Sequence, residues 1–173
     1  MASFDEHIKK AKDNLRFLET INTHACTNWD WQVTVSFYAA VHLANAHIAH
    51  KAGLHYQSHN ATINALNPLK PIPVGMEFTE PVYLAYVKLK NLSRRARYLC
   101  HEDAVQLDPA SAQAAAHHLT HDKHLYKSLK CLDTIMAFMN AQHNIVFPQI
   151  SIDCIEIRGK QFRRACMAPF GIL

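Results

Sequence analysis

The feature that most constrains the fold is a run without charge: residues 32–49 contain no Asp, Glu, Lys or Arg. Side chains that can be buried recur along it at two interleaved helical spacings: Trp31, Val35, Tyr38 and His42 in one row, and Val33, Phe37, Val41, Ala44 and Ile48 in the other. A helix that is apolar around most of its circumference has to be covered by other helices. We therefore expect residues 29–52 to form the buried central helix of a bundle, with Gly53 as its left-handed C-terminal cap.

A membrane span is the alternative interpretation of this run, because its length is adequate to cross a bilayer. Gln32, Asn45 and three histidines in or beside the run would be costly in lipid, and no second hydrophobic span follows. The sequence therefore favours a soluble helical domain that makes no contact with a membrane.

Composition agrees with an all-α protein. The chain has 173 residues, of which 49% are hydrophobic and only 18% charged, with 4 glycines, so one compact core is expected. We assign residues 1–143 to a helical bundle and residues 144–173 to a C-terminal extension. A net charge of +4 permits an acidic partner such as nucleic acid without requiring one.

The five cysteines are widely scattered, odd in number and never arranged as CxxC, which argues against a disulfide framework or a zinc knuckle. The N-terminal segment carries acids and lacks an apolar stretch, so it does not resemble a secretory signal. We therefore expect reduced thiols and a cytoplasmic protein without a resident metal or cofactor.

Helical periodicity predicts further helices on both sides of the central one. The first spans residues 3–22 and has a core stripe of Phe4, Ile8, Ala11, Leu15 and Leu18. Ser58 opens a short helix that ends near Leu66. Residues 67–81 hold four prolines and a glycine, so they predict a long crossing loop packed by Ile72, Val74, Met76 and Phe78.

Two helices are expected after this loop. The first covers residues 80–99 and has a stripe of Val82, Ala85, Leu89, Leu92, Ala96 and Leu99. Asp108 followed by Pro109 is a strong start for the next helix, which either continues to about Gln142 or breaks near Thr120. Its later part has a core face of Leu125, Leu129, Leu132, Met136 and Met139. The expected fold is an up-and-down bundle of four to five helices.

The pattern changes after Asn144. Residues 149–158, a Gly159–Lys160 turn and residues 161–168 predict a β-hairpin in which Glu156 faces Arg163. Because a lone hairpin is marginally stable, we expect it to pack on the bundle or on a second subunit.

The basic end of the 80–99 helix is the first candidate site. Six residues separate Arg94 from His101 and five separate Arg95 from it, and the side chains meet if the helix loosens after Leu99. RNA cleavage needs a general base, a general acid and a cation for the developing phosphorane charge, which an imidazole and a guanidinium from each of two subunits would supply without metal. The alternative is a solvated basic helix end followed by a histidine and two acids.

A second candidate is the quartet His117, His118, His121 and His124. Three of these share one face of a helix, and imidazoles can hold zinc. The first and last are two turns apart and rarely converge on one ion, so a solvated polar face is favoured. The scattered histidines of residues 42–59 are expected in the core or at helix ends, with His42 in a buried hydrogen bond. The standard nucleotide-binding and hydrolase motifs do not occur.

The stretch SFYAAVHLANAHIAHKAGLHYQSHNATINAL resembles the central signature of HEPN domains, which are small helical bundles. The matching positions are Phe37, Tyr38, Ala39, Ala40, His42, Ala44, Ala46, Gly53, Ser58 and His59. The later YLAYVKLKNLSRRARY is similar to the family's "LRxxADY" helix through Leu92, Ala96 and Tyr98. Ser93 and Arg97 stand where that pattern has Arg and Asp. The resemblance covers roughly residues 3–142 and leaves the hairpin as an addition.

The resemblance implies a homodimer, and many HEPN members are metal-independent ribonucleases with Arg, four to six residues, then His at the dimer interface. Arg95 and His101 fit that spacing, as do Arg94 and His101, although the polar residue that commonly follows the family's Arg is absent. In this interpretation Lys88, Lys90 and Arg97 hold the RNA backbone.

Other HEPN domains are non-catalytic modules that dimerise, bind a nucleotide or a protein, or pair with a nucleotidyltransferase in toxin–antitoxin systems. In such pairs a tyrosine two residues after the histidine is modified, and Asp103 occupies that position here. A non-catalytic interaction module is therefore the alternative function.

Overall fold

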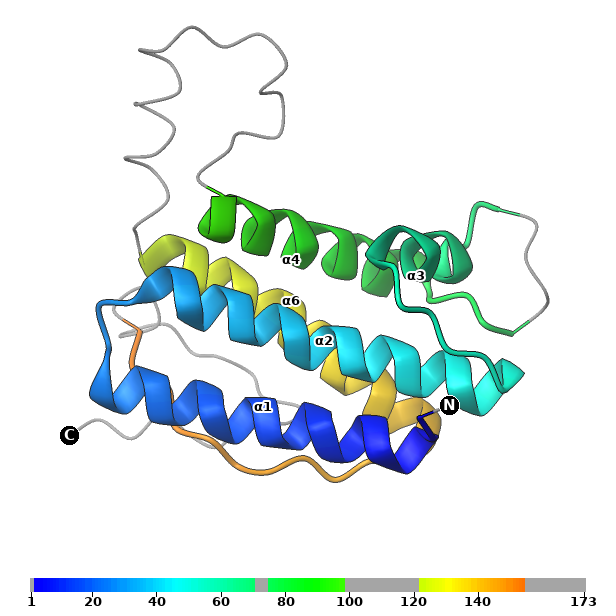
Figure 1. The fold of residues 1–173 in the computed structure, drawn as a ribbon, viewed down its shortest axis with the longest axis horizontal. Helices are drawn as coiled ribbons and strands as arrows, with labels where there is room; N and C mark the ends of the chain where they lie inside the picture. The colour runs from blue at the N-terminus through cyan, green and yellow to red at the C-terminus, as the bar shows by residue number, and fades with distance from the viewer. Residues whose placement is uncertain (1, 71–74, 99–121, 155–173) are drawn as a thin grey trace, which may run out of the picture.

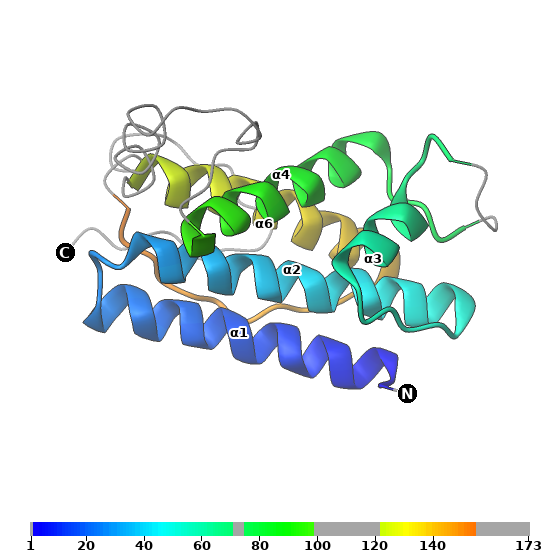
Figure 2. The same cartoon turned by 45° about the horizontal axis from the view of Figure 1, so that its top comes forward.

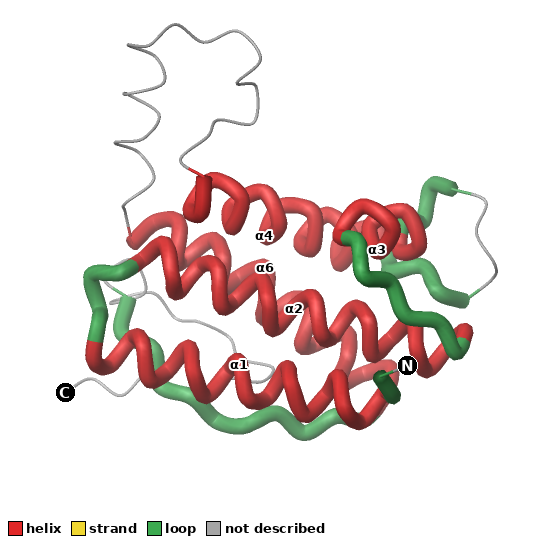
Figure 3. Tube along the Cα trace, in the orientation of Figure 1, coloured by secondary structure: helices red, strands yellow, loops and turns green. Residues whose placement is uncertain are grey.

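The computed structural model describes residues 2–70, 75–98 and 122–154, and within these ranges it is all-helical, with five helices and no strand (Figures 1 and 3). The helices are α1 (Phe4–His24), α2 (Trp29–Ala52), α3 (His59–Leu66), α4 (Glu80–Tyr98) and α6 (Asp122–His143). The all-α prediction is confirmed for these ranges. In the described residues no helix combines the length and the apolar character needed to cross a membrane.

The four long helices run alternately up and down, and α2 lies at their centre in contact with α1, α3, α4 and α6 (Figure 1). Helix α4 also packs on α6, whereas α1 lies on the other side of α2. The short α3 crosses near the C-terminal end of α2, beside the start of α4 (Figure 2). The central position predicted for the uncharged run is thus confirmed.

Helix α2 ends as predicted: Gly53 has φ 64° and its N–H donates to the Ala49 carbonyl at 2.9 Å. Asn28 occupies the N-cap position, but its side chain makes no capping hydrogen bond. One expectation is corrected. Trp31 and Tyr38 were placed in a buried row, yet they are 59% and 38% exposed, because the helices that cover α2 leave this side of its first half open.

Local sequence signals account for the ends of the shorter elements. The Ser3 hydroxyl accepts from the Glu6 N–H at 3.2 Å, and the Glu6 carboxylate accepts from the Ser3 N–H at 2.7 Å, which closes a capping box at the start of α1. Ser58 caps α3, as expected. The predicted core faces of α1 and α6 are buried, with Phe4 at the margin.

The crossing loop is anchored by two apolar side chains. Met76 and Phe78 are 2% and 0% exposed, which confirms their predicted packing role. The Phe78 ring contacts the rings of His47, Tyr86 and Phe138, and its N–H donates to the Leu66 carbonyl at 3.1 Å. Ile72 and Val74 lie outside the described residues. The loop therefore fastens α3 and α4 to the core.

Residues 144–154 form a strap along α1 rather than the start of a hairpin (Figure 1). Ile150, Ile152 and Cys154 are buried while the residues between them are exposed, so the predicted alternation is correct. Residues 149–154, the described part of the predicted first strand, form no strand, and α1 side chains bind their backbone. Ser151 N–H donates to the Glu19 carboxylate and Asp153 N–H donates to the Asn22 side chain, both at 2.7 Å.

Several expectations concern residues outside the described ranges. They are the turn at Gly159–Lys160 with its facing pairs, and the helix start at Asp108–Pro109. The break expected near Thr120 also lies there, since α6 is described from Asp122 onward.

Candidate functional site

The C-terminal half of α4 presents its basic side chains on two different flanks. At about 100° per residue, Arg95 and Lys88 lie roughly 160° around the helix from Arg97 and Lys90. The basic residues that the sequence predicts to act on one RNA therefore divide into two groups, one with Lys88 and Arg95 and the other with Lys90 and Arg97. Arg94 is on the same flank as Arg97, about 60° away from it, and it is exposed.

Arg97 lies between two tyrosines on the flank that faces α2. Its guanidinium carbon is 5.9 Å from the ring centre of Tyr38 in α2 and 5.1 Å from that of Tyr98. Its Nη1 donates to the Tyr38 hydroxyl at 3.5 Å, and its Nε donates to the Ser93 carbonyl at 3.4 Å. A planar cation over an aromatic ring is attracted by the ring's quadrupole. These contacts therefore hold the guanidinium at the surface in a defined orientation.

His59, the first residue of α3, borders the same flank. Its ring lies 5.1 Å from the Phe37 ring. Burial lowers the pKa of His59, and the positive charges of Arg97 and Lys90 lower it further. The contributions of Arg97 and Lys90 to this shift show that two positive charges lie close to the His59 ring, where α3, α2 and α4 meet.

We call this region the aromatic–basic surface. Its members come from three helices and share the open flank between α2 and α4: Tyr38, His59, Lys90, Arg94, Arg97 and Tyr98. Tyr98 is 65% exposed and Tyr38 is 38% exposed, so aromatic faces and guanidinium groups are both available to solvent. Such a mixture can bind phosphate by charge and flat rings by stacking.

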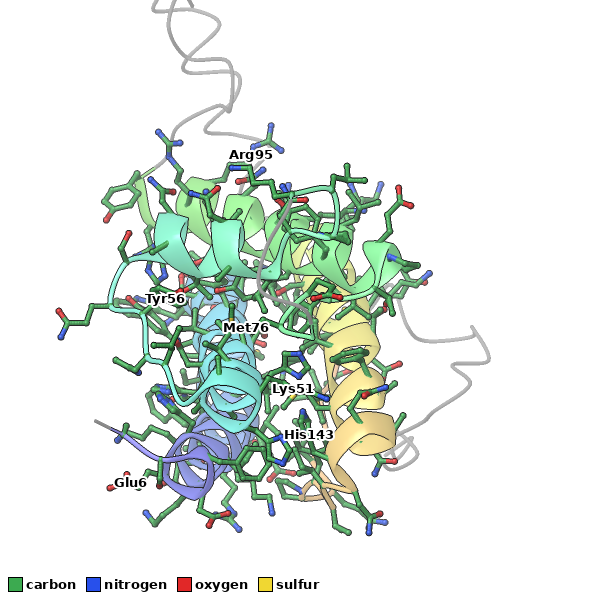
Figure 4. The ribbon with its side chains drawn as sticks, turned by 90° about the vertical axis from the view of Figure 1, so that its right-hand side faces the viewer. Glu6, Lys51, Tyr56, Met76, Arg95 and His143 are labelled. Carbon is green, nitrogen blue, oxygen red and sulfur yellow. The ribbon has the colours of Figure 1, made fainter. Side chains whose placement is uncertain are left out.

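The opposite flank of α4 carries Lys88 and Arg95. Burial raises the pKa of the Cys131 thiol in α6 and Lys88 opposes that shift, which places the Lys88 ammonium on the α6 side. Figure 4 shows Arg95 on the side of α4 that faces away from α2. His101, its predicted catalytic partner, lies outside the described residues, so the Arg–His pair stays a prediction.

The two tyrosines were not predicted as site residues. Tyr38 was assigned to a buried row, and Tyr98 was used only as part of the family resemblance. The alternation of cations and an aromatic side chain in RRARY was the available signal, since this pattern is typical of single-stranded nucleic-acid surfaces.

The histidines of α2 are in the core or at its end, as expected. His42 makes a hydrogen bond to His7 of α1, with their Nδ1 atoms 3.2 Å apart, so its predicted partnered state is confirmed. The described residues contain no cluster of three metal-ligating side chains able to hold an ion. Of the predicted histidine quartet, His124 lies in α6 and the other three lie outside the described ranges.

The described residues thus define a class: an all-α bundle whose central helix is open on one flank, where aromatic and basic side chains gather. Comparison of the chain with family models, curated proteins and solved structures finds no match. The assignment of a function therefore depends on the chemistry of the surface itself.

Proposed function

We propose that the protein is a cytoplasmic, dimeric, HEPN-like RNA-binding protein and that the aromatic–basic surface holds the RNA. The observation that carries this proposal is Arg97, whose guanidinium carbon is 5.9 Å from the Tyr38 ring centre and 5.1 Å from the Tyr98 ring centre on an exposed flank. Phosphates are attracted by Arg94, Arg97 and Lys90, and unpaired bases stack on the exposed tyrosines. RNA with a single-stranded segment is favoured over a regular duplex, since bases within a duplex present no free faces.

In this proposal the protein also cleaves bound RNA, at the C-terminal end of α4. The imidazole of His101 from one subunit takes the proton of a 2′-hydroxyl, whose oxygen attacks the adjacent phosphorus. The bond from phosphorus to the 5′-oxygen then breaks, and that oxygen receives a proton from His101 of the second subunit, which enters the reaction as the imidazolium. Arg95 stabilises the extra negative charge on the phosphorus oxygens, and Arg94 is the other arginine that fits the spacing.

Binding is tested first, by fluorescence anisotropy with a labelled single-stranded RNA at low salt. Tyr38→Ala and Arg97→Ala are each expected to weaken binding about 5- to 100-fold, since stacking on one ring contributes about 1–3 kcal/mol. Lys127→Ala is the matched control, because Lys127 is an exposed cation on α6. Equal affinities for all three variants and the unmodified protein would remove the surface from the proposal.

Cleavage is tested separately on the same RNA. His101→Ala and Arg95→Ala are expected to abolish cleavage while leaving the helical circular dichroism signal and RNA affinity unchanged. Arg94→Ala compares the two arginines that fit the spacing. If both His101→Ala and Arg95→Ala cleave at the original rate, these residues have no part in the chemistry, although the binding proposal survives.

A non-catalytic interaction module remains the second candidate, and one observation favours it. Trp31, 59% exposed, precedes Tyr38 by seven residues and shares its face of α2 within about 20°. A row of exposed aromatic side chains suits a protein interface as well as a nucleic acid. Trp31→Ala tests the use of this row: a lost oligomer by light scattering assigns Trp31 to a protein interface, and no RNA binding by the unmodified protein together with that loss favours the module.

A further inference from the structure

Six histidines gather where the start of α1 meets the ends of α2 and α6. They come from three helices and one loop: His7, His42, His47, His50, His55 and His143. Phe4 lies among them, with its ring 5.3 Å from the ring of His50 and 5.4 Å from that of His143. We call this group the histidine end of the bundle. The proposed RNA-binding function uses none of these side chains.

The first half of the histidine end is a hydrogen-bonded chain of three rings. His7 Nδ1 lies 3.2 Å from His42 Nδ1, and His7 Nε2 lies 3.0 Å from His55 Nδ1. A neutral imidazole has one N–H and one lone pair, so the neutral chain is satisfied when every ring donates in the same direction. One added proton is tolerated on His7, which then donates on both sides. With a second added proton, one of the two contacts has an N–H group on both rings and no acceptor, so its hydrogen bond is lost.

The second half joins α2 to α6. His47 Nδ1 lies 2.9 Å from His143 Nε2, and the rings of His50 and His143 are 4.7 Å apart. His47 is 1% exposed and also contacts the rings of Phe78 and Phe138. If both partners of the His47–His143 contact are charged, two N–H groups face each other with the hydrogen bond lost. This contact therefore requires at least one neutral ring.

The charged groups around the histidine end do not neutralise it. In α1, the charge of Glu6 acts on His7 and the charge of Lys10 acts on His42. The charge of Lys51 in α2 acts on His47 and His143. The charge of Glu77 in the crossing loop interacts with His47. Figure 4 shows Lys51 and His143 near the ends of α2 and α6. Both glutamates are exposed, so water screens their attraction for a protonated ring.

The surroundings favour the neutral form of four of these histidines, His7, His42, His47 and His143. Burial lowers the pKa of His42 and of His47 from 6.5 to about 4, with neighbouring imidazoles and a lysine adding to the effect in each case. The Met76 carbonyl favours the charged form of His47 but does not reverse the shift. Burial is also the main cause of the lowered pKa of His7 and His143.

We propose that the histidine end is an acid-sensitive latch, which clamps the start of α1 and the end of α6 onto α2 at neutral pH and releases them in acid. Release lets each ring take up a proton in water, whereas the closed contacts accept few protons. The equilibrium between open and closed forms therefore shifts toward the open form as pH falls below about 6.5. The expected shift is up to tenfold per pH unit for each histidine that is protonated only after release.

Hydrogen–deuterium exchange on the whole chain tests the latch at about pH 7.5, 6 and 5, with rates corrected for the intrinsic effect of pH. Peptides from residues 4–14 and 136–143 are expected to lose protection at least tenfold between pH 7.5 and 5. A peptide from residues 82–93 of α4 serves as the internal reference and is expected to change less than twofold. Unchanged protection of residues 4–14, or equal loss throughout the chain, would overturn the proposal.

His42→Gln and His47→Gln keep a hydrogen-bonding side chain that cannot be charged, so each is expected to reduce the acid-induced loss of protection. His24→Gln is the matched control, because His24 is an exposed residue at the other end of α1. If the buried variants fail to fold, a proton NMR titration of the unmodified protein decides. Titration of all six rings near pH 6.5 contradicts the latch, whereas two or more rings still neutral at pH 5.5 support it.

Discussion

The Asn22 side chain binds the backbone of Asp153 as an adjacent strand would, although the two residues are separated by 131 positions. Its Nδ2 donates to the Asp153 carbonyl at 2.9 Å, and its Oδ1 accepts from the Asp153 N–H at 2.7 Å. The same Nδ2 donates to the Gln32 side chain at 2.7 Å. A single buried amide therefore joins α1, the start of α2 and the strap.

Replacing Asn22 by alanine is expected to lower the free energy of unfolding by about 2–3 kcal/mol, since it removes two hydrogen bonds to the Asp153 backbone and the Asn22 donor to the buried Gln32 side chain. Urea unfolding followed by circular dichroism measures the change. Thr23→Ala is the control, because the exposed Thr23 hydroxyl bonds to Glu19 within α1 and is expected to cost under about 0.5 kcal/mol. Equal losses for the two variants would show that the strap contributes no specific stability.

Removing the Phe78 ring tests the anchor of the crossing loop. Phe78→Ala is expected to lower the unfolding free energy by about 3–5 kcal/mol, because a fully buried ring leaves a cavity that its neighbours only partly fill. Thermal and urea unfolding give the value. Leu69→Ala is the matched control in the same loop, since Leu69 is 81% exposed. A loss below about 1 kcal/mol for Phe78→Ala would contradict the anchoring role.

Gly53 offers a test of backbone conformation alone. Its φ is 64°, and a Cβ placed there would meet no atom within 4 Å. Gly53→Ala is therefore expected to cost about 1–2 kcal/mol purely because a side chain disfavours the left-handed region. Gly53→Asn is expected to recover part of that loss, since asparagine tolerates this conformation. Equal unfolding free energies for the Ala and Asn variants would show that another interaction decides the helix end.

The sequence predicted the elements whose signals are local. Gly53, Ser58 and the proline-rich loop each act on the residues beside them, and the structure places the corresponding helix ends within two residues of expectation. The core faces of α1 and α6 follow from spacing for the same reason. The buried central helix was also predicted, because a long helix without charged residues has to be covered by other helices.

The predictions that the structure corrects concern contacts between segments that are far apart in the sequence. Spacing along α2 identifies Tyr38 as apolar but does not indicate which side of α2 the described helices leave exposed. The alternation of Ile150 and Ile152 marks a strap buried on one side, yet it does not indicate whether a strand or the Asn22 side chain supplies the hydrogen bonds. The histidine end was missed for a similar reason, since His7 and His143 are far apart in sequence.

The salt dependence of RNA binding tests how Arg97 acts. A guanidinium that binds one phosphate releases about one counterion, so Arg97→Ala is expected to reduce the slope of log affinity against log salt by about 1. Tyr98→Phe keeps the stacking ring and is expected to leave that slope unchanged. Anisotropy titrations at several salt concentrations supply the slopes. An unchanged slope in Arg97→Ala would mean that this guanidinium orients the tyrosines without contacting phosphate.

Acid is expected to destabilise the whole fold through His47. The pKa of this side chain is about 4 in the folded protein, against 6.5 ordinarily. Above about pH 6.5 neither the folded nor the unfolded chain protonates it, so it adds no pH dependence. Between 6.5 and 4 the unfolded chain binds a proton that the folded chain does not, and the free energy of unfolding therefore falls as pH falls.

The full loss attributable to His47 is at most about 3 kcal/mol and is complete near pH 4. His42 contributes less than this bound, since water reaches part of its ring. Urea unfolding at about pH 7.5, 6 and 5 gives the slope, and His47→Gln is expected to flatten it while His24→Gln leaves it unchanged. Carboxylates titrate alike in all three proteins, so the difference between slopes isolates the imidazole. A slope in His47→Gln as steep as that of the unmodified chain would mean that His47 is protonated without opening the fold.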